Sequence, residues 1–276
     1  MKTLIFNRLQ YADDFKRVHH GYEQTQYRNF KNALDTQIKP VIDFVRLHGV
    51  INLRMSITVL VSKQPIQGAY LRCYENVGVE HASWAYKQID KIVKGNKEQK
   101  GHPTSFFSEY WRKLMRLFYE TDGGTRITQV TDTTRDNIMS LLDDAEEQGM
   151  TTSQQADYIM TNLNDPDFNR DRALRIARTE STTAANRGAM LGGESSDYET
   201  GKIWIPILDM NTRPDHAAMA GCEPIGMQET FAVGDSQMSY PGDPSGSARE
   251  VVNCRCSLAI VPLADDRGLP IMKMAA

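Results

Sequence analysis

Apolar side chains recur every three or four residues through roughly the first 165 positions, and this spacing places them on one face of an α-helix. Three long segments show it, at residues 22–47, 70–93 and 104–119. Shorter helices are predicted to begin at Thr131 and at Thr151, because these side chains can accept a hydrogen bond from the first turn of a helix. The first part of the chain is therefore predicted to be helical throughout.

Three local signals indicate where these helices bend and end. Pro40 lacks a backbone N–H and is predicted to kink or split the first helix near Ile38. Residues 53–61 are rich in β-branched side chains, which favours a strand, but they lie between helices, so we expect a helix. A long helix is predicted over residues 168–191, with a face of small side chains that permits close packing and a stop at the glycine pair that follows.

The pattern changes after this long helix. Residues 202–208 alternate isoleucines with other side chains, as a strand does, and residues 231–233 and 256–261 are predicted to be further short strands. Turn segments rich in Pro, Gly and Asp separate them. The fold class is therefore predicted to be α+β: a largely helical N-terminal region followed by a small α+β C-terminal domain with a few short strands.

Composition argues against several functional classes. The net charge of −3 gives the whole molecule no general attraction to nucleic acid, so any such contact needs a local patch. No apolar run approaches the roughly 18 residues of a membrane span, and the N-terminus does not resemble a signal peptide, so neither a membrane role nor export is expected. Four cysteines are too few for a disulfide scaffold, and in a reducing cytoplasm they are thiols or metal ligands.

A candidate metal site lies among the last cysteines. Cys254 and Cys256 are two residues apart, so in an extended chain both thiols face the same side. With His216, and with Cys222 as a candidate fourth ligand, they supply the nitrogen and sulfur ligands that zinc takes in proteins. The Cys-x-Cys spacing differs from the usual Cys-x2-Cys knuckle, however. Zinc ligands and buried, reduced thiols are therefore both open interpretations.

The segment before His216 predicts a short helix that follows a strand. Thr212 and Asp215 have the spacing of a capping box, and Pro214 suits a first helical turn. Asp209, at the end of the strand, is expected to pair with Arg213 or to orient His216. A histidine beside a carboxylate can act as a general base, but it is more often structural, so we expect a structural role.

Basic residues suggest a weaker nucleic-acid hypothesis. Five lysines lie between Lys87 and Lys100, where the alternative is a solvated helix end. Arg170, Arg172, Arg175 and Arg178 lie on the long helix over residues 168–191, and Arg172 and Arg175 are the candidate contacts among them. A nucleic-acid-binding module is therefore one alternative function, although the net charge argues against strong general binding.

Several short motifs occur in one order between residues 130 and 262. They are Ile176-Ala-Arg-Thr-Glu180, Asn186-x-Gly188, Trp204, Asp209-x2-Thr-Arg-x2-His216-x4-Gly221, Phe231, Tyr240-Pro-Gly-Asp-Pro and Asn253-Cys-Arg-Cys256. This series resembles the C-terminal domain of the phage Mu F-like minor head proteins, also called phage head morphogenesis proteins. Many relatives have Cys-x2-Cys where this chain has Arg213-x2-His216, so only the second position is a candidate ligand here.

The resemblance implies a structural minor head protein of a tailed double-stranded DNA phage. Such a protein associates with the portal inside the capsid, assembles in the host cytoplasm and belongs to the virion; contacts with the major capsid protein, the scaffold or the packaged DNA, and ejection with that DNA, are further implications. It implies no membrane, no small-molecule substrate and no enzymatic activity. The division implied is a helical region at 1–130, a minor head domain at 131–265 and a tail at 266–276. The structural motif residues are Arg178, Glu180, Asp209, Thr212, Arg213, His216, Gly221, Asn253, Cys254 and Cys256.

An enzymatic alternative rests on a looser pattern. Arg178, Ser181-Thr-Thr183 and Gln228-Glu229 echo the order of motifs in ADP-ribosyltransferases. That class needs its first two motifs on separate strands, whereas here both fall on one predicted helix. Short motifs of this kind often arise by chance, so a structural protein is the favoured prediction.

Overall fold

The computed structural model describes residues 2–94 and 104–274. Its helices are α1 (Arg8–His48), α2 (Leu53–Leu60), α3 (Gln64–Lys94), α4 (Ser108–Thr121), α5 (Arg126–Glu147), α6 (Thr152–Leu163), α7 (Arg170–Glu194), α8 (Pro214–Ala217) and α9 (Ala248–Val251). Its strands are β1 (Thr200–Ile205), β2 (Ile225–Gly226), β3 (Phe231–Val233), β4 (Ser236–Met238) and β5 (Ser257–Pro262). The predicted α+β class is confirmed.

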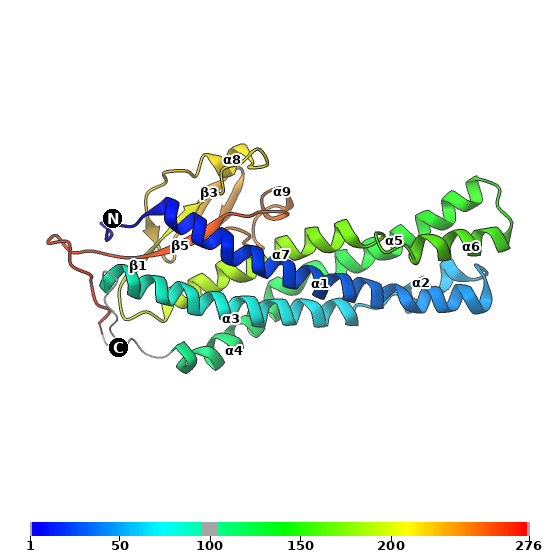
Figure 1. Cartoon of the computed structure of the whole chain (residues 1–276), viewed down its shortest axis with the longest axis horizontal. Helices are drawn as coiled ribbons and strands as arrows, with labels where there is room; N and C mark the ends of the chain where they lie inside the picture. Colours follow the sequence, from blue (N-terminus) through cyan, green and yellow to red (C-terminus); the bar gives the residue numbers. More distant parts are fainter. Residues whose placement is uncertain (1, 95–103, 275–276) are drawn as a thin grey trace.

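The molecule is a long helical bundle with a small β region at one end (Figure 1). Helices α2 and α6 lie at the far end of the bundle, which we call the arm tip. In the β region, β1 pairs antiparallel with both β2 and β5, and β3 and β4 form a separate hairpin. No helix among the described residues has the length and apolar character of a membrane span.

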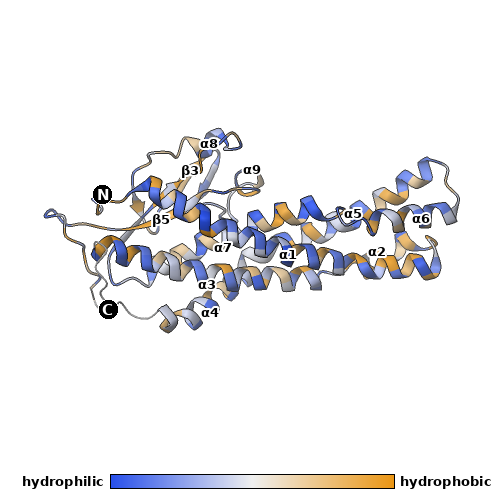
Figure 2. Cartoon of the chain, in the orientation of Figure 1, coloured by the Kyte–Doolittle hydropathy of each residue, from blue (hydrophilic) through white to orange (hydrophobic). Residues whose placement is uncertain are grey.

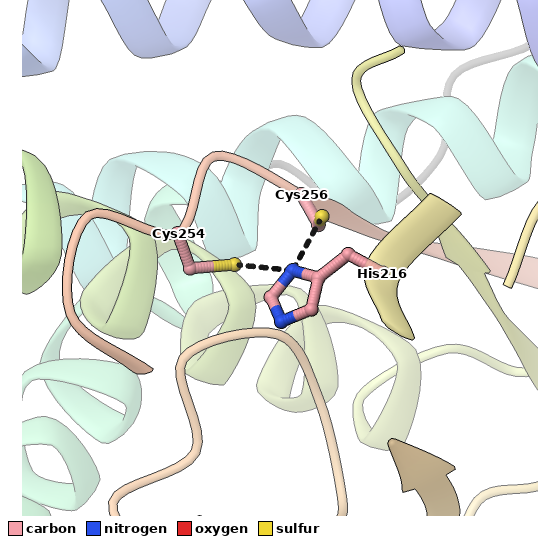
Figure 3. Close-up of side chains that lie close together, drawn as sticks. All are labelled: His216, Cys254 and Cys256. Carbon is pink, nitrogen blue, oxygen red and sulfur yellow. Dashed lines mark hydrogen bonds between the residues drawn. The ribbon is translucent and has the colours of Figure 1, made fainter. Parts of the chain in front are cut away.

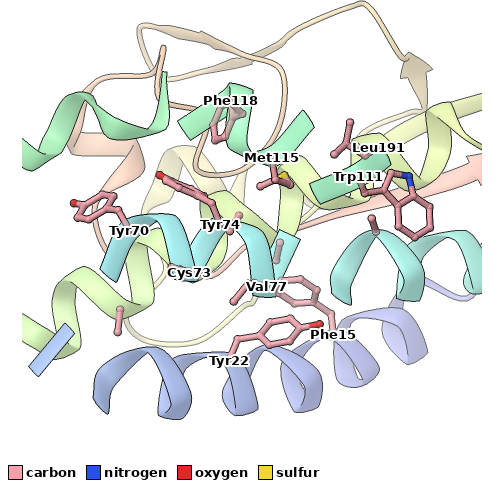
Figure 4. Close-up of a cluster of buried hydrophobic side chains, with 14 of the residues drawn as sticks. Phe15, Tyr22, Tyr70, Cys73, Tyr74, Val77, Trp111, Met115, Phe118 and Leu191 are labelled. Atoms are coloured by element: carbon pink, nitrogen blue, oxygen red, sulfur yellow. The ribbon is translucent and has the colours of Figure 1, made fainter. Parts of the chain in front are cut away.

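One hydrophobic core joins the helices to the sheet. Apolar and polar residues alternate along the long helices, as expected for helices with one buried face (Figure 2). Phe15, Tyr74 and Trp111 are buried where α1, α3 and α4 meet (Figure 4), and the same cluster continues to Val261 of β5. The hydroxyl of Tyr11 on α1 also donates to the carbonyl of Leu258 at 2.7 Å. The predicted division at residue 131 falls inside α5.

Of the predicted kink or split at Pro40, the split is wrong, because α1 continues through this residue to His48. Pro40 is exposed, so its ring faces solvent, while the neighbouring Ile38 and Val41 are buried in the core cluster at the arm tip. Burial of such side chains is worth roughly 1.5–3 kcal/mol each, which is comparable to the usual cost of about 3 kcal/mol for a proline inside a helix. Packing therefore offsets the lost hydrogen bond.

Two predicted helix starts had different outcomes. Thr151 caps α6 as expected and forms a capping box with Gln154. Thr131 does not start a helix, because α5 begins at Arg126. The Thr131 hydroxyl is buried and accepts a hydrogen bond from Gln37 on α1 at 3.2 Å. The helix predicted over residues 53–61 is confirmed as α2.

The glycine pair at Gly192 was predicted to stop α7, but the helix runs on to Glu194. These glycines act in packing instead. A Cβ atom added to Gly188 would fall on the backbone of Gly78, and one added to Gly192 would fall on the carbonyl of Ala82, each closer than 3.0 Å. Because glycines have no side chain, the backbone of α7 lies directly against α3 at these positions. The contact between these two helices is the most extensive between elements of the fold.

We expect Gly188→Ala to destabilise the protein by about 1–3 kcal/mol or more, because the added methyl group meets backbone atoms that cannot rotate away. Gly21→Ala is the matched control, since Gly21 lies in α1 with nothing near its missing Cβ and should gain up to about 1 kcal/mol in helix propensity. Denaturant unfolding of both variants measures the difference. Equal stability of the two variants would contradict the close packing of α3 and α7.

Candidate metal centre

Helix α7 holds the closing Asn-Cys-Arg-Cys segment by polar side chains that are themselves buried. The Thr179 hydroxyl accepts from the N–H of Asn253 at 2.9 Å, and the Thr182 hydroxyl donates to the carbonyl of Cys254 at 2.6 Å. Asn186 donates to the carbonyl of Cys256 at 3.0 Å and accepts from the next strand's N–H at 2.8 Å. We call Thr179, Thr182, Thr183 and Asn186 the polar ladder of α7. It fixes the backbone on which both cysteines lie.

The same ladder holds a second loop. The Thr183 hydroxyl donates to the carbonyl of Gly242 at 2.7 Å, and Asn186 donates to that of Pro241 at 2.9 Å. Within the closing segment, Asn253 has a φ of 58°, a left-handed conformation that asparagine tolerates better than most residues. The turn at Asn253 and the two loops therefore meet along one face of α7.

His216, Cys254 and Cys256 come together as a buried group (Figure 3). Nδ1 of His216 lies 3.3 Å from Sγ of Cys256 and 3.7 Å from Sγ of Cys254. The His216 ring lies on α8, and its edge-on contact with Trp204 of β1, with ring centroids 5.5 Å apart, holds it in place. The structure thus brings together the three residues that the sequence singled out as candidate ligands.

The donor set suits a zinc ion. Zinc–sulfur bonds of 2.3 Å and zinc–nitrogen bonds of 2.0–2.1 Å in a tetrahedron separate nitrogen and sulfur ligands by about 3.5 Å, close to the two distances found here. Nε2 of His216 lies 2.9 Å from Oε2 of Glu250, a buried carboxylate on α9. A carboxylate in this position keeps the proton on Nε2 and leaves Nδ1 free to bind a metal. The three side chains therefore fit a zinc site with one further position to fill.

The two thiols differ in their pKa. A hydrogen bond from the Cys254 thiol lowers the pKa of Cys256 well below its usual value. Burial raises this pKa, and the hydrogen bond with His216 lowers it further. The hydrogen bond between the two thiols, together with burial, raises the pKa of Cys254. Cys222 is not in the group, because its thiol lies against the carbonyl of Trp204 at 3.6 Å. Its proposed place as a fourth ligand is therefore wrong in this arrangement.

The expected partners of Asp209 are corrected by the structure. Its carboxylate forms a two-bond ion pair with Arg255, at 2.6 and 2.7 Å, instead of pairing with Arg213 or reaching His216. The hydrogen bond from Arg255 is the main reason that the pKa of Asp209 falls to about 2. Arg213 donates instead to the carbonyl of Val252. Both arginines thus tie the loop before α8 to the closing segment.

The predicted capping box at Thr212 is also wrong. Arg213 is the N-cap of α8, and its side chain makes no capping hydrogen bond. The Thr212 hydroxyl donates to the carbonyl of Ile207 and accepts from the N–H of Asp209 at 2.9 Å, which closes the loop after β1. Pro214 takes the first turn of α8, as predicted. Gly221 has a φ of 81°, so the turn after α8 needs a residue without a side chain.

Glu180 lies on α7 in a buried network. Its carboxylate accepts from the hydroxyl of Tyr74 at 2.6 Å and of Tyr70 at 3.2 Å, and it pairs with Arg126 at 2.7 Å. Burial, followed by the Glu180 charge, raises the pKa of both tyrosines, so they stay protonated donors. Arg178, two residues before Glu180, pairs with Glu23 of α1 at 2.9 Å. The Arg-Thr-Glu motif therefore ties α7 to α1, α3 and α5.

The remaining candidates lie apart from the cysteines. Arg172 donates to the carbonyl of Val130 at 3.0 Å and to Thr134 at 3.1 Å, whereas Arg175 is exposed. Of the lysine run, Lys97 and Lys100 lie outside the described residues. The residues of the ADP-ribosyltransferase pattern do not form a common site: Ser181-Thr-Thr183 are buried inside α7, and Glu229 accepts from the N–H of Gly226 in the turn after β2.

Sequence reasoning missed Glu250 and the polar ladder of α7. A glutamate in an exposed-looking turn sequence gives no sign of burial, so Glu250 could not have been found from its neighbours. The polar ladder could have been found from the sequence, because its members recur at three- and four-residue spacing and so lie on one helix face. Polar residues on a helix face that also carries alanines are a sign of buried hydrogen bonds.

Taken together, these features describe a helical protein with a small β region whose polar residues cross-link loops to one helix. Residues 136–259 match the family model of phage Mu protein F like proteins. This segment of the chain is therefore similar to phage Mu protein F like proteins. No curated protein and no solved structure matches the chain.

We expect the purified chain to contain about one zinc per molecule, with Cys256→Ser losing most of it because a hydroxyl is a poor zinc ligand. Cys222→Ser is the matched control and should keep its zinc, since that thiol lies outside the group. Elemental analysis after gel filtration measures both. Zinc-free wild-type protein purified from zinc-supplemented cells would show that the three residues only pack together.

We expect Glu180→Gln to destabilise the protein by about 3–5 kcal/mol, because it leaves the charge of Arg126 buried without its partner. Glu194→Gln serves as the control: its carboxylate is partly exposed and lies 3.8 Å from Arg187, so its loss should cost less than about 1 kcal/mol. Thermal or denaturant unfolding compares the two. A Glu180→Gln protein as stable as the wild type would mean that the network contributes little to the fold.

Proposed function

We propose that this chain is a minor head protein of a tailed double-stranded DNA phage that associates with the portal inside the capsid. The observation that carries the proposal is the family match over residues 136–259, which covers α7, the polar ladder and the candidate metal centre. The geometry supports a structural role, because the polar residues of this region bond to one another and to backbone atoms. The zinc ion, in this proposal, holds the closing segment against α8 and does no chemistry.

The arm tip is the surface that we propose for the portal contact. Four large apolar side chains are exposed near the end of α1 and on α2: Leu47, Ile51, Met55 and Val59. Exposed apolar side chains that gather at one end of a molecule are typical of protein interfaces. The arm places them far from the β region (Figure 1), so the tip can reach a neighbouring protein while the β region stays free.

Co-expression of the chain with the portal protein of the same phage tests this proposal. The two should co-purify, and the double variant Met55→Lys, Val59→Lys should lose the complex, because two buried charges at an interface core are unfavourable. Met210→Lys is the control, since Met210 is fully exposed in the loop after β1, away from the tip. Normal heads and normal infectivity after deletion of the gene would refute the proposal as a whole.

DNA contact and release with the DNA remain a second, weaker proposal. Exposed Arg175 and the lysines at the end of α3 are the residues that support it. The net charge of −3 does not favour binding to DNA. A filter-binding titration without salt-dependent affinity for duplex DNA would exclude this contact and leave the portal proposal untouched.

A further inference from the structure

A cleft of about 200 Å³ lies between α3, α5 and α7, and Val252, just before the closing segment, forms part of its wall. Three arginines line it, Arg126, Arg172 and Arg175, and Glu180 is the one carboxylate among the described residues of its wall. Three aliphatic side chains form part of the rest, those of Val130, Ile176 and Val252. The cleft therefore combines an excess of two positive charges with apolar walls.

Two of these guanidinium groups have no acidic partner. Among the residues that the structure describes, no carboxylate lies within 4.0 Å of Arg172 or Arg175, whereas the other two arginines at this end of α7, Arg170 and Arg178, are each paired. Burial, and next the charge of Arg175, lower the pKa of Arg172 to about 10, so it is still charged at neutral pH. Arg172 is held by neutral hydrogen-bond partners such as Val130 and Thr134, and Arg175 is exposed, so neither positive charge is neutralised within the cleft.

Arg126 adds a second sign of a missing partner. One of its terminal nitrogens pairs with Glu180, but its Nε atom is buried and has no hydrogen-bond partner among the residues that the structure describes. Buried guanidinium N–H groups are normally satisfied. Thr133 and Gln129 stand at the same cleft and provide hydroxyl and amide groups. The cleft thus offers donors to an anion and side-chain partners to a peptide backbone.

We propose that this cleft binds a carboxylate carried by an extended segment of a partner protein, with aliphatic side chains beside the acidic one. The carboxylate contacts Arg175 and Arg172, and an aliphatic neighbour lies against Val130 and Ile176. A nucleic-acid backbone fits less well, because its phosphates have no aliphatic neighbours. Tyr70 supplies the one aromatic ring within the described lining of the cleft, and it is buried and offers no face for a base. The proposal does not depend on the portal contact, since the arm tip is a separate surface.

The test uses the full-length protein and a fluorescein-labelled peptide, Leu-Glu-Leu-Glu, with Leu-Gln-Leu-Gln as the neutral probe. We expect saturable binding of the acidic peptide alone. Arg175→Gln should weaken it by about tenfold or more, because a charge-assisted hydrogen bond is lost. Thr133→Glu, which places a carboxylate at the rim, should weaken it as well. Both positions are exposed, so the variants should fold normally.

Arg170→Gln is the matched control, because Arg170 lies on α7 outside the cleft and already pairs with Asp167. Its affinity for the acidic peptide should equal that of the wild type. The proposal is overturned if the acidic peptide does not bind, or if Arg175→Gln binds it as tightly as the wild type does. It is also overturned if a labelled oligonucleotide displaces the peptide from the wild-type protein and no longer binds the Arg175→Gln variant, since the cleft would then be a phosphate site.

Discussion

The hydrogen bonds that the polar ladder of α7 makes to backbone atoms are the interaction on which the β region depends. Thr179, Thr182 and Asn186 reach the closing segment 70 or more positions later in the chain. Side-chain groups buried without a partner would cost about 1–3 kcal/mol each, so the helix and the loops specify each other. The candidate metal centre lies on this support: the backbone of both cysteines is fixed by α7 before any ion is considered.

Close contact between α3 and α7 is the second constraint, and it explains why α7 can carry polar groups at all. Small residues such as Gly188 and Gly192 bring the two backbones together. The opposite face of α7 is then free to hold loops through short hydroxyl and amide side chains. A helix with large apolar residues at these positions would stand further from α3, and the loops of the β region would move with it.

The sequence allowed the fold class and most helices to be predicted, because their apolar spacing is a local property. It failed where a residue has two physical uses. The glycines of α7 read as a stop but serve packing, and Pro40 reads as a break but lies on a solvent-facing side of α1. In the site, His216, Cys254 and Cys256 could be grouped by chemical type. The partner of Asp209 could not, because Arg255 lies 46 positions away and only the folded loops choose it over the nearer Arg213.

The bond between Tyr11 and Leu258 joins residues 247 positions apart. During synthesis, α1 therefore leaves the ribosome long before α7, against which it packs. It also leaves long before β5, whose Leu258 carbonyl accepts the hydrogen bond from Tyr11. Contacts between such distant parts of a chain form slowly, because a large loop must close first. Part of the apolar face of α1 stays uncovered in the meantime, so the newly made chain is most vulnerable to aggregation, and most dependent on chaperones, until α7 and β5 have emerged.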